Sequence, residues 1–317
     1  SRAGICDSRL IAGLLFIRHL SGDLVGAEAE ARRLRVVARQ SGIAYTEAWA
    51  SYMQACTRLH RHDLAGAVDL FADAAGHRYI QHGRAAVDTL AGLALSQQLL
   101  GRADDAAATV DLLQEFALQL DVGFLPVVEA CRARLSLLRG DVTEAIGWAR
   151  SFGEPPVVSE LFVWLEVPWI TRTRALIAAG TDKTLTEAVE LLAAIRGQSE
   201  ACRFTNQTIE VAVLQSLAFE KRGRADEALE TLQDALALAA PGGWIRPFVE
   251  AGPPMAELIA RVPAEPAQAA LVEQILSAAG GAEAAQAPTK RPPVNLLTDR
   301  EQEVLELLAQ RLQYKEI

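Results

Sequence analysis

Hydrophobic residues recur along this chain at helical spacing, in pairs of segments separated by a short turn. The clearest pair surrounds Gly101, within the stretch LALSQQLLGRADDAA. Ala94 lies seven residues before this glycine and Ala106 lies five residues after it. Small residues at these positions let two helices cross closely, and glycine adopts the turn conformation that a Cβ atom would resist. The stretch therefore predicts a helical hairpin.

The same frame recurs along the chain with steps of 39 to 43 residues. The turn positions are Gly22, His62, Gly101, Gly140, Gly180 and Gly223. Five of them are followed five residues later by an alanine, namely Ala27, Ala67, Ala106, Ala145 and Ala228, and the turn at Gly180 is a looser copy with Ala188. A period of about 40 residues is typical of a stacked array of helical hairpins. We therefore predict an all-α fold, a curved, tetratricopeptide-like superhelical solenoid of about six hairpins.

The pattern places the paired helices at 8–20 with 25–40, 45–59 with 64–75, 85–100 with 103–120, 127–138 with 143–152, 161–179 with a partner from 184, and 205–222 with 225–239. Gly153-Glu154-Pro155-Pro156 should interrupt the array, since helix is disfavoured there. Pro168 should either kink its helix or mark the true start of that helix. Thr184 and Glu187 form a capping box for the next helix.

Beyond residue 240 the pattern changes, which divides the chain into an array at 1–240 and three further parts. Residues 241–279 should cap the array, first with a broken hairpin at 244–262, interrupted by Gly252-Pro253-Pro254, and then with a helix near 267–279. Residues 280–294 are rich in Ala, Gly and Pro, as linkers are. Residues 295–317 begin another helical unit, with a capping box at Thr298 and Glu301.

Composition narrows the class of protein. Hydrophobic residues make up 50% of the chain and charged residues 22%, which is typical of a globular protein. The net charge of −9 argues against a broad surface for nucleic acid or anionic membranes. No apolar run reaches the roughly 20 residues of a membrane span. The start, SRAGICDSRL, has neither a signal peptide nor an initiating Met and falls inside a repeat, so we expect part of a longer cytoplasmic protein.

The four cysteines, Cys6, Cys56, Cys131 and Cys202, are far apart and form no CxxC motif. We expect reduced, packed thiols.

Two segments resemble a known family. Leu297-Thr298-Asp299-Arg300-Glu301, followed by Glu303-Val304-Leu305, Leu307-Leu308-Ala309 and Lys315-Glu316-Ile317, resembles the opening of a LuxR-type helix-turn-helix. The segment Trp244–Leu258, with Arg246-Pro247-Phe248 and Gly252-Pro253-Pro254-Met255, is similar to the stretch that ends the repeat domain of large MalT-like LuxR regulators. The resemblance implies an upstream nucleotide-binding switch domain, a helical repeat sensor that promotes assembly, and a C-terminal DNA-binding domain.

The chain departs from that family pattern in three ways. It contains no GxxxxGK[ST] phosphate loop, so we expect no cofactor here and ATP only on an upstream domain. The helix-turn-helix stops before its recognition helix. Arg311 and then Gln313-Tyr314 stand where the family has glycine and a small N-cap residue. Residues 289–317 carry five Lys/Arg and five Asp/Glu, and we expect DNA binding only from a complete helix-turn-helix.

Candidate binding residues follow from the repeat frame. In tetratricopeptide-like arrays, the first helix of each hairpin lines the concave groove. Counting back from the turns, the groove-facing set is Trp49, Tyr52, Asp88, Gln98, Arg134, Arg174 and Glu210. Aromatic rings together with paired donors and acceptors predict a site for a small polar effector, such as a sugar or an acid. Alternatively, the aromatic residues pack between hairpins and the charges are solvated.

Other residues carry less chemistry. The aromatic cluster from Phe162 through Trp164 to Trp169 either fills the core around Pro168 or provides a stacking site. His60 and His62 are two residues apart, and His77 and His82 are five apart, so neither pair has the spacing of a helical metal site.

The motifs GxSxG and HExxH are absent from the chain. We therefore expect no metal and no enzyme activity. The sequence predicts the sensing and oligomerisation repeat domain of a LuxR/MalT-like transcription regulator. The alternative is a helical-repeat scaffold that binds a protein or peptide. The sequence does not decide whether the chain forms a homo-oligomer.

Overall fold

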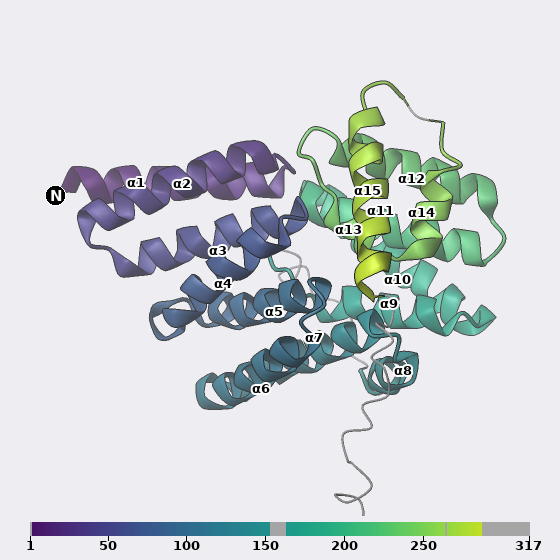
Figure 1. Cartoon of the computed structure of the whole chain (residues 1–317), viewed down its shortest axis with the longest axis horizontal. Helices are drawn as coiled ribbons and strands as arrows, with labels where there is room; N and C mark the ends of the chain where they lie inside the picture. Colours follow the sequence, from purple (N-terminus) through teal and green to yellow (C-terminus); the bar gives the residue numbers. More distant parts are fainter. Residues whose placement is uncertain (1, 153–162, 264, 287–317) are drawn as a thin grey trace, which may run out of the picture. The chain divides into compact units, whose positions relative to one another are not determined.

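The computed structural model describes residues 2–152, 163–263 and 265–286, and every regular element in these ranges is helical (Figure 1). The six hairpins are α1 (Arg2–Leu20) with α2 (Leu24–Ser41), α3 (Ala44–His60) with α4 (Leu64–Gly76), α5 (Gly83–Leu99) with α6 (Ala103–Leu120), α7 (Leu125–Leu138) with α8 (Val142–Ser151), α9 (Pro168–Ala179) with α10 (Asp182–Ala201), and α11 (Thr205–Lys221) with α12 (Ala225–Ala239). Short 3-10 turns, η1 (Arg78–Ile80) and η2 (Val122–Phe124), precede α5 and α7. The predicted all-α solenoid of hairpins is confirmed, and α6 and α12 have the predicted bounds.

All six predicted turn residues adopt a left-handed backbone conformation. Their φ angles lie between 65° and 84° at Gly22, His62, Gly101, Gly140, Gly180 and Gly223. Five of the six are glycine, for which this conformation carries no Cβ penalty. His62 adopts it at a steric cost, and it is one of two non-glycine residues in the described chain with positive φ.

The outer, second helix of each hairpin packs on its partner through small residues. Side chains fully withdrawn from solvent include Ala27, Ala67, Ala106, Ala145, Ala188 and Ala228. In α12 the buried stripe continues at Leu232, Ala235 and Ala239, four, seven and eleven residues after Ala228, so it follows one helical face. The register counted from the turns is therefore confirmed.

Several outer helices begin with the same aspartate cap. The side chains of Asp23, Asp63 and Asp141 each accept a hydrogen bond from the backbone N–H three residues further on. This bond satisfies one of the unpaired donors at the start of a helix. In the first two hairpins an arginine five residues earlier, Arg18 or Arg58, also pairs with this carboxylate.

The fifth hairpin differs from the prediction at one of its helix starts. Pro168 opens α9 and does not kink it, because the first turn of a helix has no hydrogen bond for proline to break. Helix α10 (Asp182–Ala201) begins two residues before Thr184, and its cap lies three residues before the predicted one. Thr181 is its N-cap, and it exchanges hydrogen bonds of 3.1 and 3.2 Å with Thr184. The capping box therefore joins two threonines, and Glu187 takes no part in it.

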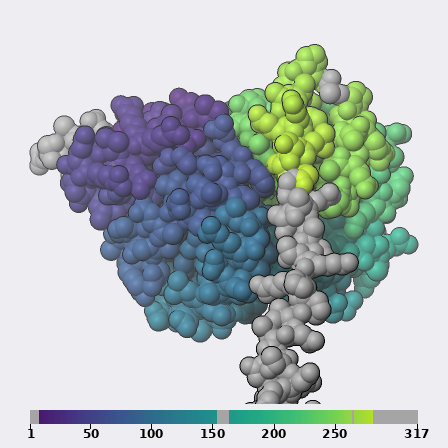
Figure 2. All heavy atoms as spheres, in the orientation of Figure 1, coloured from purple at the N-terminus to yellow at the C-terminus, as the bar shows by residue number. Residues whose placement is uncertain are grey.

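The first helices of the six hairpins, which we call the inner helices, form a closed ring of contacts. Each of α1, α3, α5, α7, α9 and α11 contacts the next, and α1 also contacts α11. In the view of Figure 2, the N-terminal helices, in purple, lie beside the C-terminal helices, in green and yellow. Because the two ends of the array meet, the side chains of the inner helices face one shared centre.

Three helices follow the array. The predicted broken hairpin is confirmed as α13 (Arg246–Glu250) and α14 (Pro253–Ile259), which are separated at Gly252 with φ 80°. Helix α15 (Ala269–Gln286) runs on past residue 279, so the first part of the predicted linker is helical. The predicted helix-turn-helix at 295–317 lies outside the described residues.

The structure tests the expectation of packed thiols and the expectation that the chain has no membrane span. Cys56 and Cys131 are free and buried, as expected, whereas Cys202 directly after α10 is exposed, so the expectation of a packed thiol is wrong there. No helix in the described ranges is long and apolar enough to cross a membrane.

Replacing Gly101 by alanine tests the turn conformation against a matched glycine. A Cβ atom would meet nothing within 4 Å at Gly101 or at Gly147 of α8, but only Gly101 has positive φ. We expect Gly101→Ala to lower the free energy of unfolding by about 1 kcal/mol. Gly147→Ala should raise it by about 0.5–1 kcal/mol. Urea unfolding measures both, and shifts of the same sign would contradict the assigned turn.

Candidate functional site

Most of the predicted effector residues lie in the shared centre of the inner helices. Trp49, Tyr52, Asp88, Arg134, Arg174 and Glu210 are buried, and Gln98 near the end of α5 is half-buried. Trp49 stacks on Phe16 with ring centroids 5.0 Å apart and lies 5.3 Å from the ring of Tyr52. The charged members are paired with one another or with neighbouring residues, so the alternative that they are solvated is wrong.

Asp88 of α5 anchors the segment that leads into α9. Its carboxylate accepts hydrogen bonds from the Tyr52 hydroxyl at 2.7 Å and from the backbone N–H groups of Leu165 and Glu166 at 2.8 and 3.0 Å. Arg84, one turn earlier on α5, pairs with it at 3.1 Å. The charge of this fully buried carboxylate is thus balanced and its oxygens are hydrogen-bonded.

Arg134 of α7 is the residue to which most groups in the centre connect. It is 2% exposed, and its guanidinium donates to both carboxylate oxygens of Glu250 at 2.5 and 2.8 Å. It also donates to Glu166 at 3.0 Å and to the carbonyl oxygen of Leu165 at 2.7 Å. The two bonds to Glu250 are a bidentate pair, the strongest form of such an interaction.

Two more arginines complete the set. Arg174 of α9 donates to Glu210 of α11 at 2.7 Å, and Arg246 of α13 donates to both Glu210 and Glu250. We call the six residues the inner ion cluster; they are Arg134, Arg174, Arg246, Glu166, Glu210 and Glu250. It contains three guanidinium and three carboxyl groups, from α7, α9, α11, α13 and the segment before α9.

The arginines hold two of these carboxyl groups in the charged form. Burial alone would raise the pKa of Glu210, but Arg246, Arg174 and Arg134 together lower it to about 2. The pKa of Glu250 likewise lies well below its ordinary value despite burial, chiefly because of Arg134 and Arg174. At Glu166 burial outweighs Arg134, and the pKa is raised.

The first residues after the array join this centre to the first two hairpins. Trp244 Nε1 donates to the carbonyl oxygen of Gly22 at 2.8 Å, and the Ile245 N–H donates to the carbonyl oxygen of His60 at 2.8 Å. Arg246 Nε donates to His60 Nδ1 at 3.3 Å. A Cβ atom at Gly242 would lie 2.0 Å from the Gly22 oxygen, so only glycine fits this approach. We call these contacts the seam.

Sequence reasoning missed three members of the cluster, Arg246, Glu250 and Glu166. Counting from the hairpin turns reaches only the repeats, and these residues lie outside the regular repeat frame. A signal was nevertheless present, because Arg246 and Glu250 are opposite charges four residues apart within the otherwise apolar WIRPFVEAGPPM. Charges of that spacing share a helix face, and in apolar surroundings they point to a buried pair.

The remaining candidates lie elsewhere. Trp169 is 4% exposed and packs against Phe152 with centroids 5.0 Å apart, which confirms the core-filling interpretation for this residue. Arg84 lies over the ring of Trp164 at 4.9 Å, and Phe162 is outside the described residues. Among described residues, no group of three His, Cys, Asp or Glu side chains could hold a metal ion.

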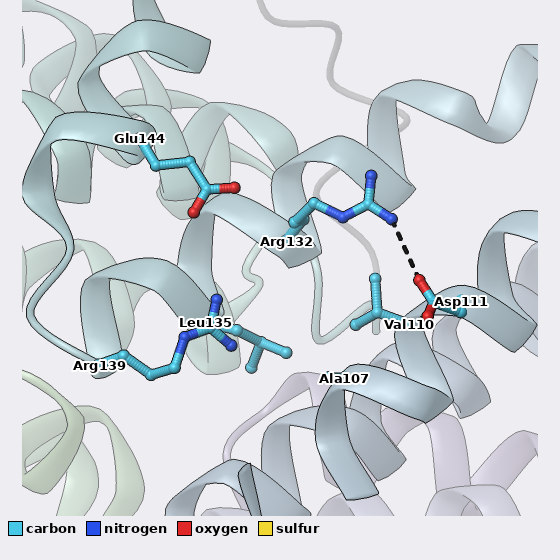
Figure 3. Close-up of a pocket in the computed structure, with 7 residues that line it drawn as sticks. All are labelled: Ala107, Val110, Asp111, Arg132, Leu135, Arg139 and Glu144. Atoms are coloured by element: carbon cyan, nitrogen blue, oxygen red, sulfur yellow. Dashed lines mark ion pairs between the residues drawn. The ribbon is translucent and has the colours of Figure 1, made fainter. Parts of the chain in front are cut away.

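A small pocket lies apart from the inner ion cluster, between α6, α7 and α8 (Figure 3). Its lining residues are Ala107, Val110, Asp111, Arg132, Leu135, Arg139 and Glu144. Arg132 pairs with Asp111 at 3.6 Å across it, and none of the predicted effector residues lines it.

Hairpins of about 40 residues around a closed centre define a helical repeat domain of the tetratricopeptide type. Comparison with known families identifies which one: the model for the MalT-like TPR region matches residues 11–265, most of the chain. This chain belongs to that family. The match includes α13 and α14, so the helices that close the centre are part of the family's domain. No curated protein matches the chain.

The inner ion cluster can be tested by a double-mutant cycle on Arg246 and Glu250. Arg246→Met and Glu250→Leu alone each leave buried charge unpaired and should lower the free energy of unfolding by about 3–5 kcal/mol. The double variant removes one charge of each sign. Its loss in free energy of unfolding should be smaller than the sum of the two single losses by more than about 1 kcal/mol. The exposed pair Arg224 and Glu227, changed in the same way, should show little coupling. Additive losses at Arg246 and Glu250 would contradict the cluster.

His19 predicts a dependence of stability on pH. Its side chain is fully buried at the seam, 6.0 Å from the Trp244 ring, and neither ring nitrogen has a hydrogen-bond partner within the described chain. Burial lowers the pKa of His19 from 6.5 to about 4. The unfolded chain therefore binds this proton more tightly, and the free energy of unfolding falls as the pH drops from 6.5 to about 4.

The decrease in the free energy of unfolding that His19 causes should reach about 3 kcal/mol at pH 4. Denaturant unfolding at pH 7 and pH 4 measures it for the wild type and for His19→Phe, which should show a smaller decrease. The same change at the exposed His82 is the control. An equal pH dependence in wild type and His19→Phe would assign the effect to other groups.

Proposed function

We propose that this chain is the signal-sensing and oligomerisation repeat domain of a LuxR/MalT-type transcription regulator. Membership of the MalT-like TPR family over residues 11–265 supports the regulator class. The resemblance of residues 297–317 to the opening of a LuxR-type helix-turn-helix supports DNA as the final target of the complete protein. ATP, where the regulator uses it, binds to a separate domain, because this chain has no phosphate loop.

The effector acts on the inner wall formed by Trp49, Tyr52, Asp88, Arg134 and Arg174. The observation that carries this proposal is the bidentate pair between Arg134 and Glu250. Glu250 belongs to α13, outside the repeats, so the repeats supply the guanidinium while a following segment supplies the carboxylate. An arginine in such a pair binds any planar acid group in the same way.

The effector is therefore best matched by a small polar molecule with an acid group. Its carboxylate takes the place of Glu250 on Arg134 and Arg174, its hydroxyl groups bond Asp88, and an apolar face lies on Trp49 or Tyr52. This exchange requires α13 to leave the centre. Departure of α13 also breaks the bonds of Ile245 and Arg246 to His60, and so opens the seam.

Opening the seam provides a route from binding to assembly. Interior surface of α3 and α11 that α13 now covers becomes available to another chain, since both helices contact α13. The effector shifts the population toward this open form only as far as it binds that form more tightly. Oligomerisation then follows from the newly exposed surface.

A thermal-shift screen of sugars, amino acids and organic acids tests this function on the full chain. A ligand at about 100 times its dissociation constant stabilises the folded state by about 2.7 kcal/mol. We expect an acid to be the hit and to lose its effect in Arg134→Ala. Its effect should grow in Glu250→Gln, because the internal competitor is weaker, while Glu273→Gln on the exposed surface of α15 leaves it unchanged.

Two results would contradict the proposal. A hit that stabilises Arg134→Ala and Trp49→Ala as much as wild type binds elsewhere, for example in the pocket at Arg132. If no small molecule stabilises the chain and a purified protein or peptide partner does, the chain is a scaffold.

A further inference from the structure

Helix α1 exposes a row of large apolar side chains on one face. Leu10, Leu14 and Ile17 are 67%, 37% and 64% exposed, and Gly13 lies exposed among them. The spacing of four and three residues places them along one side of the helix. The core of the hairpin is formed instead by Ile11 and Leu15, which are 2% and 0% exposed. The exposed row is therefore a second apolar face of α1, separate from the face that packs in the core of the hairpin.

The repeat register allows the exposure of this face to be compared with that of the equivalent face in other inner helices. The equivalent positions are Ala50, Gln54 and Thr57 in α3, Thr89, Leu93 and Ser96 in α5, and Val211, Gln215 and Ala218 in α11. All nine side chains are buried. The array therefore covers this face in α3, α5 and α11. In α7 and α9 the positions equivalent to Leu10 and Ile17 are also buried, while the middle position is a partly exposed arginine.

The cover is the outer helix of the preceding hairpin. At the register position of Leu14, Gln215 of α11 accepts a hydrogen bond from Arg196 of α10 at 3.2 Å. At the same position of α7, Arg132 donates to Gln114 of α6 at 2.8 Å. Arg172 of α9 likewise donates to the carbonyl oxygen of Ala149 in α8 at 3.1 Å. Three junctions thus place an outer helix against this register position.

We propose that the Leu10–Leu14–Ile17 face of α1 is the seat of one more outer-type helix, carried on the same polypeptide. The face continues an interface that the array repeats at each of its other inner helices. Its occupant is an amphipathic helix with the buried stripe of α10, where Leu185, Ala188, Leu192 and Ile195 are at most 2% exposed. Three apolar residues on α1 need an apolar partner, and a helix of this pattern supplies it.

The size of the face favours a tethered helix over a second copy of the chain. Stable interfaces between separate proteins bury about 800 Å² on each partner. A row of three side chains on one helix offers well under half of that, by a rough estimate from typical side-chain areas. A helix joined by a short turn binds within the molecule at an effective concentration in the millimolar range or above, so a small face is sufficient.

Grafting the chain's own α10 onto α1 tests the proposal. Residues 182–204, which comprise α10 and its following turn, are fused directly before Gly4, the residue in register with Thr205 at the start of α11. We expect the melting temperature to rise by about 4 °C or more, and backbone amides of α1 to exchange more slowly with deuterated solvent. Leu14→Asp should change the ungrafted chain little, because Leu14 lies on the surface, and should abolish both gains in the graft.

A second control replaces Leu192 and Ile195 by aspartate in the grafted copy alone, which should also abolish both gains. The proposal is overturned if the graft leaves melting and amide exchange unchanged, or if either control retains the gain. It is also overturned if light scattering finds a dimer of the ungrafted chain that Leu14→Asp converts to monomer, since the face would then pair two copies.

Discussion

The bidentate pair between Arg134 and Glu250 is the interaction on which the closed form of this repeat domain depends. Both groups are almost fully buried, and a buried charge is tolerated only when its partner and its remaining hydrogen bonds are all in place. Satisfying Arg134 requires α7, the segment before α9, and α13 to be positioned together. The inner ion cluster thus links parts of the chain more than 100 residues apart.

This link changes the mechanics expected of a solenoid. In an open array each hairpin contacts only its neighbours, and stability is a sum of local terms. Here the seam joins residues after α12 to the first two hairpins, through Trp244 and Ile245. A disturbance at α13 is therefore felt at α1 and α3 without passing through the intervening hairpins. Helix α1 is the first inner helix that the structure describes and also a wall of the centre, and its two faces differ strongly in exposure.

How far the sequence predicts this molecule depends on whether local or distant contacts decide a feature. The hairpins follow from local chemistry, and even His62 takes the left-handed turn that its register demands. The direction of Arg134, Arg174 and Glu210 toward the centre also follows from that register. Whether they meet solvent does not, because α13 closes the centre and lies outside the period. The exposed row on α1 is likewise invisible in the sequence, since its pattern matches that of a buried face.

The charge pattern of α13 is compatible with the opening proposed above. Arg246 and Glu250 carry opposite charges on the same short helix, so its departure removes one charge of each sign. The groups left behind still pair, Arg134 with Glu166 at 3.0 Å and Arg174 with Glu210 at 2.7 Å. Loss of any single member of the cluster would instead leave an unpaired buried charge. Well-packed apolar residues of the same volume often stabilise a protein as much as a buried ion cluster does, but they would lack the charged groups that the proposed effector needs. Among the described elements that contribute to the cluster, α13 is the one that carries a charge of each sign, so the departure proposed for it keeps the remaining charges balanced.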